Sequence, residues 1–71
     1  MTDTELLKRK IDDSGYKIIF LADKVGLTPQ GFYKKLKDGS DWTFSQVMIL
    51  QELLRLTKEE IDAIFFNQKV E

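Results

Sequence analysis

Hydrophobic residues recur at three- and four-residue spacing along most of the chain, which places their side chains on one face of an α-helix. Five such stretches are separated by short polar or glycine-containing segments. None shows the strict alternation of apolar and polar residues that is typical of a half-buried strand. The pattern therefore predicts an all-α fold of five helices, with residues 1–71 forming a single compact domain.

Residues that cap helix ends mark the outer elements of this fold. Thr2–Glu5 precede a helix that should end at Ser14-Gly15. Thr43–Gln46 and Thr57–Glu60 each have the spacing of a capping box, so each should open a helix. We expect the following apolar residues of these helices to be buried: Leu6, Leu7, Ile11, Phe44, Val47, Leu50, Leu54, Ile61, Ile64 and Phe65.

The segment Leu21–Gly39 predicts two short helices joined by a tight turn. Gly26 follows the last apolar position of the first helix, where glycine adopts the left-handed conformation that ends many helices. Leu27 lies inside the turn, and an apolar residue there should fill the corner between the helices. Thr28 can cap the second helix, and Pro29 suits its first position because that N–H would have no helical partner.

Apolar residues define the inner side of these two helices. The small side chain of Ala22 allows a second helix to approach closely, and Phe32 and Leu36 form an inward stripe on that second helix. Gly31 interrupts the second helix at a cost of about 1 kcal/mol relative to alanine. Two explanations for this glycine stay open: close packing on Ala22, or close approach to a DNA backbone.

The outer side of the second helix is polar but not acidic, and it has the chemistry to read DNA. Glutamine can bond to an adenine edge, lysine can donate to guanine, and a proline ring or threonine methyl can contact a thymine methyl. A helix that faces the major groove with its N-terminal part makes such contacts. Tyr33 also lies on this side, where no pocket is obvious for it. The candidate base-reading residues are Thr28, Pro29, Gln30, Tyr33 and Lys34.

The distribution of charge supports this interpretation more than the total does. The formal net charge is −1, whereas DNA-binding domains are usually basic. Residues 14–37 contain five lysines and one aspartate, a local charge of +4, whereas residues 38–71 contain three basic and seven acidic residues. Trp42 either covers the core or donates its indole N–H to a phosphate. The candidate phosphate-binding residues are Lys17, Lys24, Lys35, Lys37 and Trp42.

The same segment resembles the lambda-repressor-like family of phage repressors and Cro-type proteins. The family's small, turn and core positions are occupied by Ala22, Gly26, Leu27, Phe32 and Leu36. The resemblance extends from about Leu6 to Phe66 and is strong for small Cro-like regulators of prophages in Gram-positive bacteria, which share a Gln-Gly-Phe-Tyr-x-Lys-Leu run. It implies a helix-turn-helix formed by the second and third helices. It also implies that the bases are read by Pro29, Gln30, Tyr33 and Lys34.

The last predicted helix bears on assembly. Phe65 and Phe66 are adjacent and therefore point about 100° apart on a helix, so one core cannot easily hold both rings. The candidate dimer-interface residues are Phe65 and Phe66. A homodimer through this helix would bury the second ring and place two recognition helices about 34 Å apart on a palindromic operator. The alternative is that a short C-terminal tail covers the ring.

Composition narrows the function classes further. Without cysteine or histidine, the chain has no thiolate or imidazole for catalysis or zinc binding. We expect no enzyme activity, catalytic residue, metal, cofactor or small-molecule substrate. The apolar runs are too short for a membrane span, which favours a cytoplasmic protein.

The sequence thus predicts a sequence-specific transcriptional regulator that binds double-stranded DNA, with a repressor of the Cro type as the favoured form. The alternative is a protein-interaction adaptor with the same fold, such as an antirepressor or antitoxin-like partner, that acts through the C-terminal helix. An apolar helix contact would respond little to salt, whereas DNA binding would weaken steeply.

Overall fold

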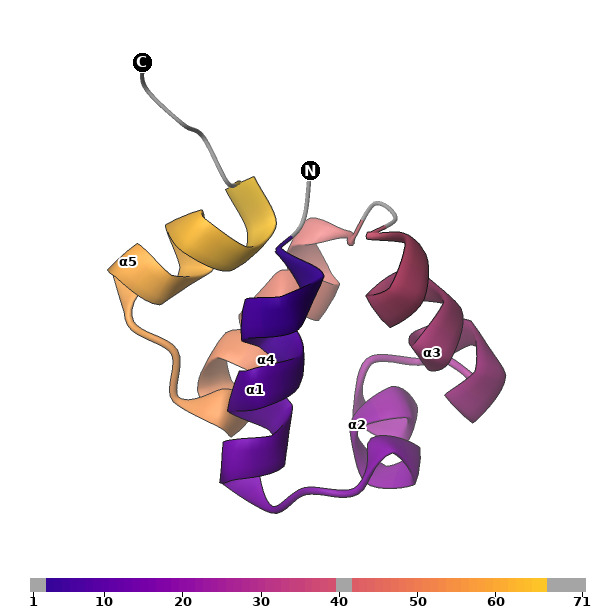
Figure 1. Ribbon diagram of the computed structural model, residues 1–71. Helices are drawn as coiled ribbons and strands as arrows, with labels where there is room; N and C mark the ends of the chain where they lie inside the picture. The colour runs from indigo at the N-terminus through magenta and orange to yellow at the C-terminus, as the bar shows by residue number, and fades with distance from the viewer. Residues whose placement is uncertain (1–2, 40–41, 67–71) are drawn as a thin grey trace.

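The computed structural model describes residues 3–39 and 42–66, and within these ranges the regular elements are all helices, without any strand. The prediction of an all-α fold is therefore confirmed for this part of the chain (Figure 1). The elements in chain order are α1 (Thr4–Ser14), α2 (Ile18–Lys24), α3 (Pro29–Asp38), α4 (Phe44–Leu54), α5 (Lys58–Ile61) and a short π-helical segment, η1 (Asp62–Phe66).

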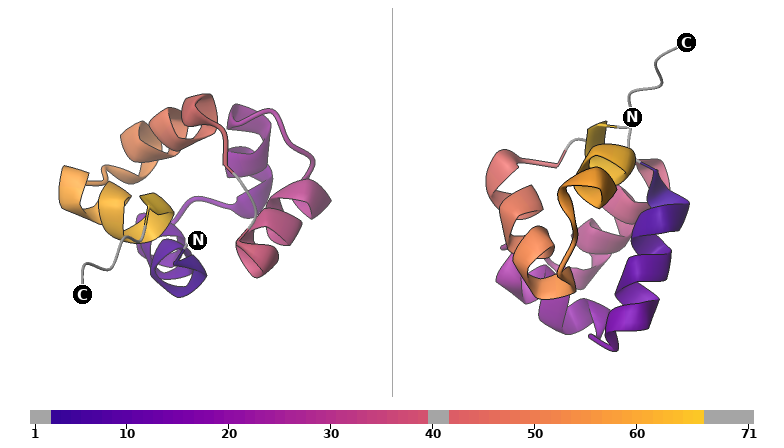
Figure 2. Two further views of the ribbon diagram at one scale, coloured as in Figure 1. Left: turned by 90° about the horizontal axis from the view of Figure 1, so that it is seen from above. Right: turned by 90° about the vertical axis from the view of Figure 1, so that its left-hand side faces the viewer.

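The helices surround one core. In Figures 1 and 2, α2 and α3 lie on one side of α1, α5 lies on the other side, and α4 closes the back. Contacts join α2 to α3, and α1 packs against α3, α4 and η1. This arrangement leaves one side of α3 facing outward.

Each helix of the described residues contributes to the core. Leu7 of α1, Leu21 of α2 and Phe32 of α3 are completely buried, as are Leu50 of α4 and Ile64 of η1. Complete burial of such a side chain contributes about 1.5–3 kcal/mol relative to leaving it in water. The position of α3 is therefore fixed by the same apolar cluster that holds the other helices together.

Side-chain caps begin α1, α3, α4 and α5 where the sequence predicts them. The N–H of Leu6 donates to Asp3 at the start of α1, and the Thr43 and Thr57 capping boxes open α4 and α5 with both of their reciprocal bonds. The predicted end of α1 is also confirmed, because Gly15 has a φ of 79° in the left-handed region. Local hydrogen bonding thus fixes the helix ends.

Phe44 corrects one prediction about the core. The sequence predicts a buried side chain, but in the structure this residue is 76% exposed. The buried stripe of α4 runs through Val47, Leu50 and Leu54, whereas Phe44 and Met48, one turn apart, both lie on the exposed side. Phe44 is the first residue of the helix, so the capping pattern that identifies the helix start does not determine whether its ring is covered.

Two contacts tie the ends of the described chain together. The N–H of Asp3 donates to the carbonyl of Ile64 over 2.6 Å, and Lys10 of α1 forms an ion pair with Glu60 of α5. The hydrogen bond from Lys10 lowers the pKa of Glu60 below its ordinary value, and the bond from the Thr57 N–H acts in the same direction. The first and last helices are therefore joined by polar contacts as well as by the core.

No helix in the described ranges combines the length and the apolar character that crossing a bilayer would require.

Candidate nucleic-acid interface

The turn between α2 and α3 sets the position of the candidate interface. Gly26 has a φ of 78°, and its N–H donates to the carbonyl of Asp23. The N–H of Leu27 donates to the carbonyl of Ala22 over 2.8 Å, while the Leu27 side chain packs half-buried against the core. The chain therefore reverses within a few residues around an apolar corner, as the sequence predicts.

The first turn of α3 is built around Thr28. The Thr28 hydroxyl accepts the N–H of Gly31 over 3.0 Å, and Pro29 occupies the first helical position. A Cβ on Gly31 would lie 3.2 Å from the Thr28 oxygen and 4.0 Å from a Leu27 methyl group.

These contacts test one of the two explanations for Gly31. Ala22 is not among the neighbours of the added Cβ, so close packing on Ala22 does not explain the glycine. The nearest neighbour of the added Cβ is the Thr28 cap oxygen, but Gln46 and Glu60 carry side chains at the equivalent position behind Thr43 and Thr57, so the cap does not require a glycine either. A close approach of DNA to Gly31 stays a prediction.

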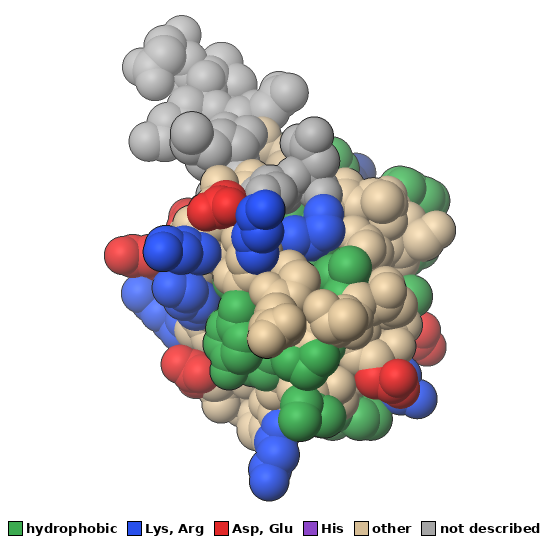
Figure 3. All heavy atoms as spheres, turned by 90° about the vertical axis from the view of Figure 1, so that its right-hand side faces the viewer, with side chains coloured by type: hydrophobic (Ala, Val, Ile, Leu, Met, Phe, Trp, Pro, Cys, Tyr) green, Lys and Arg blue, Asp and Glu red, His purple; other side chains and the backbone are tan. Residues whose placement is uncertain are grey.

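The candidate base-reading residues lie together on the exposed side of α3. Pro29 and Gln30 begin the helix in solvent, and Tyr33 follows with 57% of its surface exposed. Thr28 and Lys34 are also exposed. Figure 3 shows this side of the molecule, where lysine and arginine side chains gather toward one edge with hydrophobic side chains below them.

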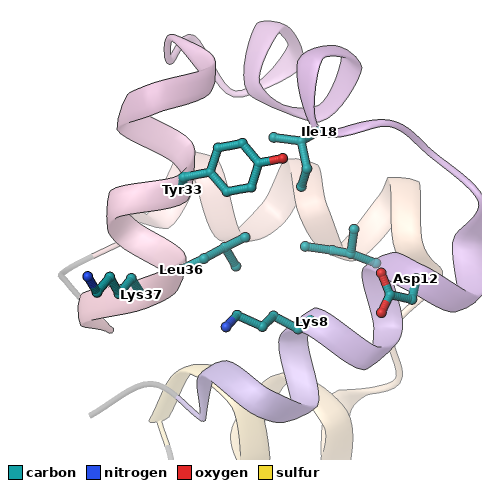
Figure 4. A pocket seen from close by; sticks show the side chains of 7 residues that line it. Lys8, Asp12, Ile18, Tyr33, Leu36 and Lys37 are labelled. Atoms are coloured by element: carbon teal, nitrogen blue, oxygen red, sulfur yellow. The ribbon is translucent and has the colours of Figure 1, made fainter.

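Tyr33 differs from the sequence expectation in one respect. Its ring lies beside a groove that also involves Ile18 of α2 and Ile11 of α1 (Figure 4). The ring borders this groove without being enclosed by it, since 57% of the Tyr33 surface stays exposed. The groove runs between helices that are far apart in sequence, so residue spacing within α3 could not reveal it.

The candidate phosphate-binding lysines have different surroundings. Lys17, Lys24 and Lys37 are all exposed. The Lys24 amine lies 5.3 Å from the centroid of the Phe20 ring, a distance typical of a cation–π contact. Lys17 precedes α2 without a side-chain capping bond, which leaves its side chain uninvolved in starting that helix.

Trp42 belongs to the core side of the molecule. Its ring packs edge-on against Phe32 and Phe65, with centroid separations of 5.4 and 6.0 Å. The indole N–H is buried and has no hydrogen-bond partner among the described residues. The core alternative for Trp42 therefore describes this structure, and the phosphate contact is corrected because the enclosed N–H cannot reach a phosphate.

Lys35 lies at the border between the outer side of α3 and the core. It is half-buried, and its amine is 5.6 Å from the centroid of the Trp42 ring. Its stem therefore covers apolar surface near the tryptophan. A phosphate contact for Lys35 stays a prediction, but its substitution would also disturb packing.

The two adjacent phenylalanines of η1 differ in burial, as expected for side chains that point in different directions from one helix. Phe65 is 9% exposed and contributes to the core, whereas Phe66 is 53% exposed. The assignment of Phe65 to a dimer interface is corrected, because its own domain covers the ring. Phe66 alone remains for the predicted dimer contact, and the alternative C-terminal tail lies outside the described residues.

Comparisons with protein-family models, with curated proteins and with solved structures found no match. The function is therefore inferred from the chemistry of the chain's own residues.

Proposed function

We propose that this protein is a sequence-specific, double-stranded DNA-binding transcriptional regulator, and that α2, the turn and α3 act as its helix-turn-helix. The observation that carries the proposal is the capped N-terminal end of α3, where Pro29 and Gln30 stand exposed. This end lies within residues 14–37, whose local charge is +4 in a chain of net charge −1. The proposal assigns the lambda-repressor-like architecture and a Cro-like repressor role to the chain.

In this proposal the exposed side of α3 enters the major groove. Gln30 would bond to an adenine, Lys34 would donate to a guanine, and Pro29 would contact a thymine methyl. Lys17, Lys24 and Lys37 would bind phosphates and so fix the register of the protein on the duplex. Because residues 38–71 carry an excess of acidic groups, the protein would be oriented with α3 toward the DNA.

The salt dependence of binding tests this proposal. For a duplex that the protein binds, we expect log Kd to rise linearly with log salt concentration, because phosphate neutralisation releases counterions. Lys37→Ala should reduce the slope by about 1, the contribution of one phosphate contact. The matched control is Lys58→Ala, which removes an exposed lysine of α5 and should leave the slope unchanged.

Fluorescence anisotropy of a labelled duplex measures these slopes. Binding that is insensitive to salt, or equal slopes for the wild type and Lys37→Ala, would contradict the phosphate assignment.

The exposure of Phe66 favours one second candidate, a protein-interaction adaptor that uses the C-terminal helix. Burial of apolar surface depends little on ionic strength compared with phosphate binding. A protein partner that binds equally at low and moderate salt, with no DNA binding at either, would favour the adaptor over the regulator.

A further inference from the structure

A groove lies between α1, the beginning of α2 and the flank of α3 (Figure 4). Its volume is about 550 Å³, within the range of roughly 300–1,000 Å³ that is usual for small-molecule sites. Its apolar lining comes from three helices, because Ile11 belongs to α1, Ile18 to α2 and Leu36 to α3. The Tyr33 ring stands beside them with its hydroxyl directed toward Ile18.

The polar side chains of the groove are separated by sign. Figure 4 shows the Lys8 amine reaching toward Leu36 of α3 and Asp12 at the other end of the groove, whereas the Lys37 side chain runs along the outer side of α3 with its amine directed away from Lys8. Both lysines are exposed, and neither forms an ion pair with a described residue. A negatively charged group would therefore be attracted to the Lys8 end and repelled from the Asp12 end.

We propose that this groove binds a small organic anion with an apolar body, in which a carboxylate or sulfonate is carried by an aromatic or branched aliphatic group. The anionic group would lie at the Lys8 amine. The apolar body would cover Ile11, Ile18 and Leu36 and pack against the face of Tyr33. The charge separation along the groove gives the ligand one orientation.

The groove shares two residues with the proposed DNA-binding face. Tyr33 and Lys37 line the groove and also belong to the candidate interface on α3. A ligand that packs against Tyr33 would compete with DNA for this side chain. The groove would then be a regulatory site at which an organic anion releases the operator, and this regulatory role, unlike ligand binding itself, rests on the proposed function.

The binding step is tested without DNA. The probe is 8-anilinonaphthalene-1-sulfonate, an aromatic sulfonate whose fluorescence increases in an apolar site, titrated into the full chain labelled with ¹⁵N. We expect saturable 1:1 binding, with amide shifts concentrated at the groove residues Ile11, Ile18, Tyr33 and Leu36. N-phenyl-1-naphthylamine, which lacks the sulfonate, should bind more weakly.

Two charge reversals on α1 form a matched pair. Lys8→Glu places a negative charge in the groove and should weaken binding of the sulfonate about tenfold. Arg9→Glu makes the same change of charge at an exposed neighbour that does not line the groove, and it should change affinity less than twofold. Both positions are exposed, so circular dichroism should show the same helical content for both variants.

Three results would overturn the proposal. Shifts confined to the exposed side of α4 around Phe44 and Met48 would place the probe elsewhere. Equal effects of the two charge reversals would remove the role of Lys8. A dimer in sedimentation that Lys8→Glu dissociates would show that a second copy covers the groove.

The regulatory step is tested with the same probe and a bound duplex. We expect saturating sulfonate to release DNA from the wild type, and Lys8→Glu to require about tenfold more of it. If the protein binds the probe and the duplex together, and neither changes the affinity for the other, the regulatory role is overturned. Saturable binding of the probe by a chain that binds no duplex would contradict the proposed function while supporting the ligand site.

Discussion

At the scale of single residues, Thr28 takes part both in the folding of α3 and in the proposed recognition of DNA. Its hydroxyl accepts the Gly31 N–H and so fixes the first turn of α3. The hydroxyl is thereby engaged within the protein, which leaves the methyl group for contact with a thymine. Gln30 lies in the same turn with its side chain in solvent, so its amide retains both the donor and the acceptor that adenine recognition needs.

Gln30→Ala tests base reading directly. The substitution should cost about 1–3 kcal/mol of binding free energy on a preferred duplex and relax the preference at one base pair. Thermal stability should change little, because the side chain is exposed. Anisotropy titrations against duplexes with each single base change measure both effects. Ser45→Ala, at an exposed position of α4, is the control and should retain the wild-type preference.

An unchanged preference at every base pair in Gln30→Ala would remove Gln30 from the set of base readers.

Burial of individual aromatic residues was only partly predictable. The adjacency of Phe65 and Phe66 correctly indicated that one ring would stay outside the core, and the helical spacing of Ile61, Ile64 and Phe65 correctly placed Phe65 on the buried stripe. Trp42 and Phe44 flank the start of α4, yet Trp42 packs between two rings while Phe44 faces solvent. Their environments depend on which helices lie opposite them, and this is a property of tertiary packing.

At the scale of helices, the helix starts and the turn were predictable because hydrogen bonds between residues close in sequence determine them. A threonine with a glutamine or glutamate three residues later opens α4 and α5. In each pair the two side chains accept hydrogen bonds from each other's backbone N–H groups. Gly26 and Leu27 likewise determine the turn through contacts within a few residues. The groove beside Tyr33 was not predictable, since it requires Ile11, Ile18 and Leu36 to come together from three helices.

The Lys10–Glu60 contact between α1 and α5 predicts a specific response to acid. The pKa of Glu60 is lowered in the folded protein, chiefly by the hydrogen bond from Lys10, so the folded state favours the charged carboxylate. This contribution to stability is fully present above the ordinary glutamate value of 4.5 and is lost as the pH falls through the lowered pKa. Glu60→Gln should therefore be less stable than the wild type at neutral pH.

Urea unfolding at several pH values measures this difference. The gap between the wild type and Glu60→Gln should narrow below pH 4.5. Glu52→Gln, an exposed position on α4, is the matched control and should show no such narrowing. A gap that is constant from neutral to acidic pH would contradict the ion-pair assignment.

At the scale of the whole molecule, charge and exposed apolar side chains are spread over several helices. The outer side of α3 lies within the basic segment, η1 presents Phe66, and α4 presents Phe44 and Met48. A symmetric dimer through Phe66 would bury this ring against its copy and supply a second copy of α3. Two such helices would match a palindromic site with half-sites about one duplex turn apart.

Sedimentation at micromolar concentration, alone and with DNA, tests this assembly. We expect the wild type to form a dimer at least on DNA, and Phe66→Ala to shift the equilibrium toward monomer. Phe44→Ala removes another exposed phenylalanine and should leave the assembly unchanged, which makes it the matched control. A wild type that stays monomeric under both conditions excludes the dimer.

Selection of bound sequences from a random pool of duplexes tests the central claim most directly, because the pool offers the protein every possible half-site at once. We expect enrichment of one sequence with two inverted half-sites, and loss of preference at one position of each half-site with Gln30→Ala. No enrichment over the starting pool, under conditions where the chain is folded, would contradict the assignment of this protein as a sequence-specific DNA-binding regulator.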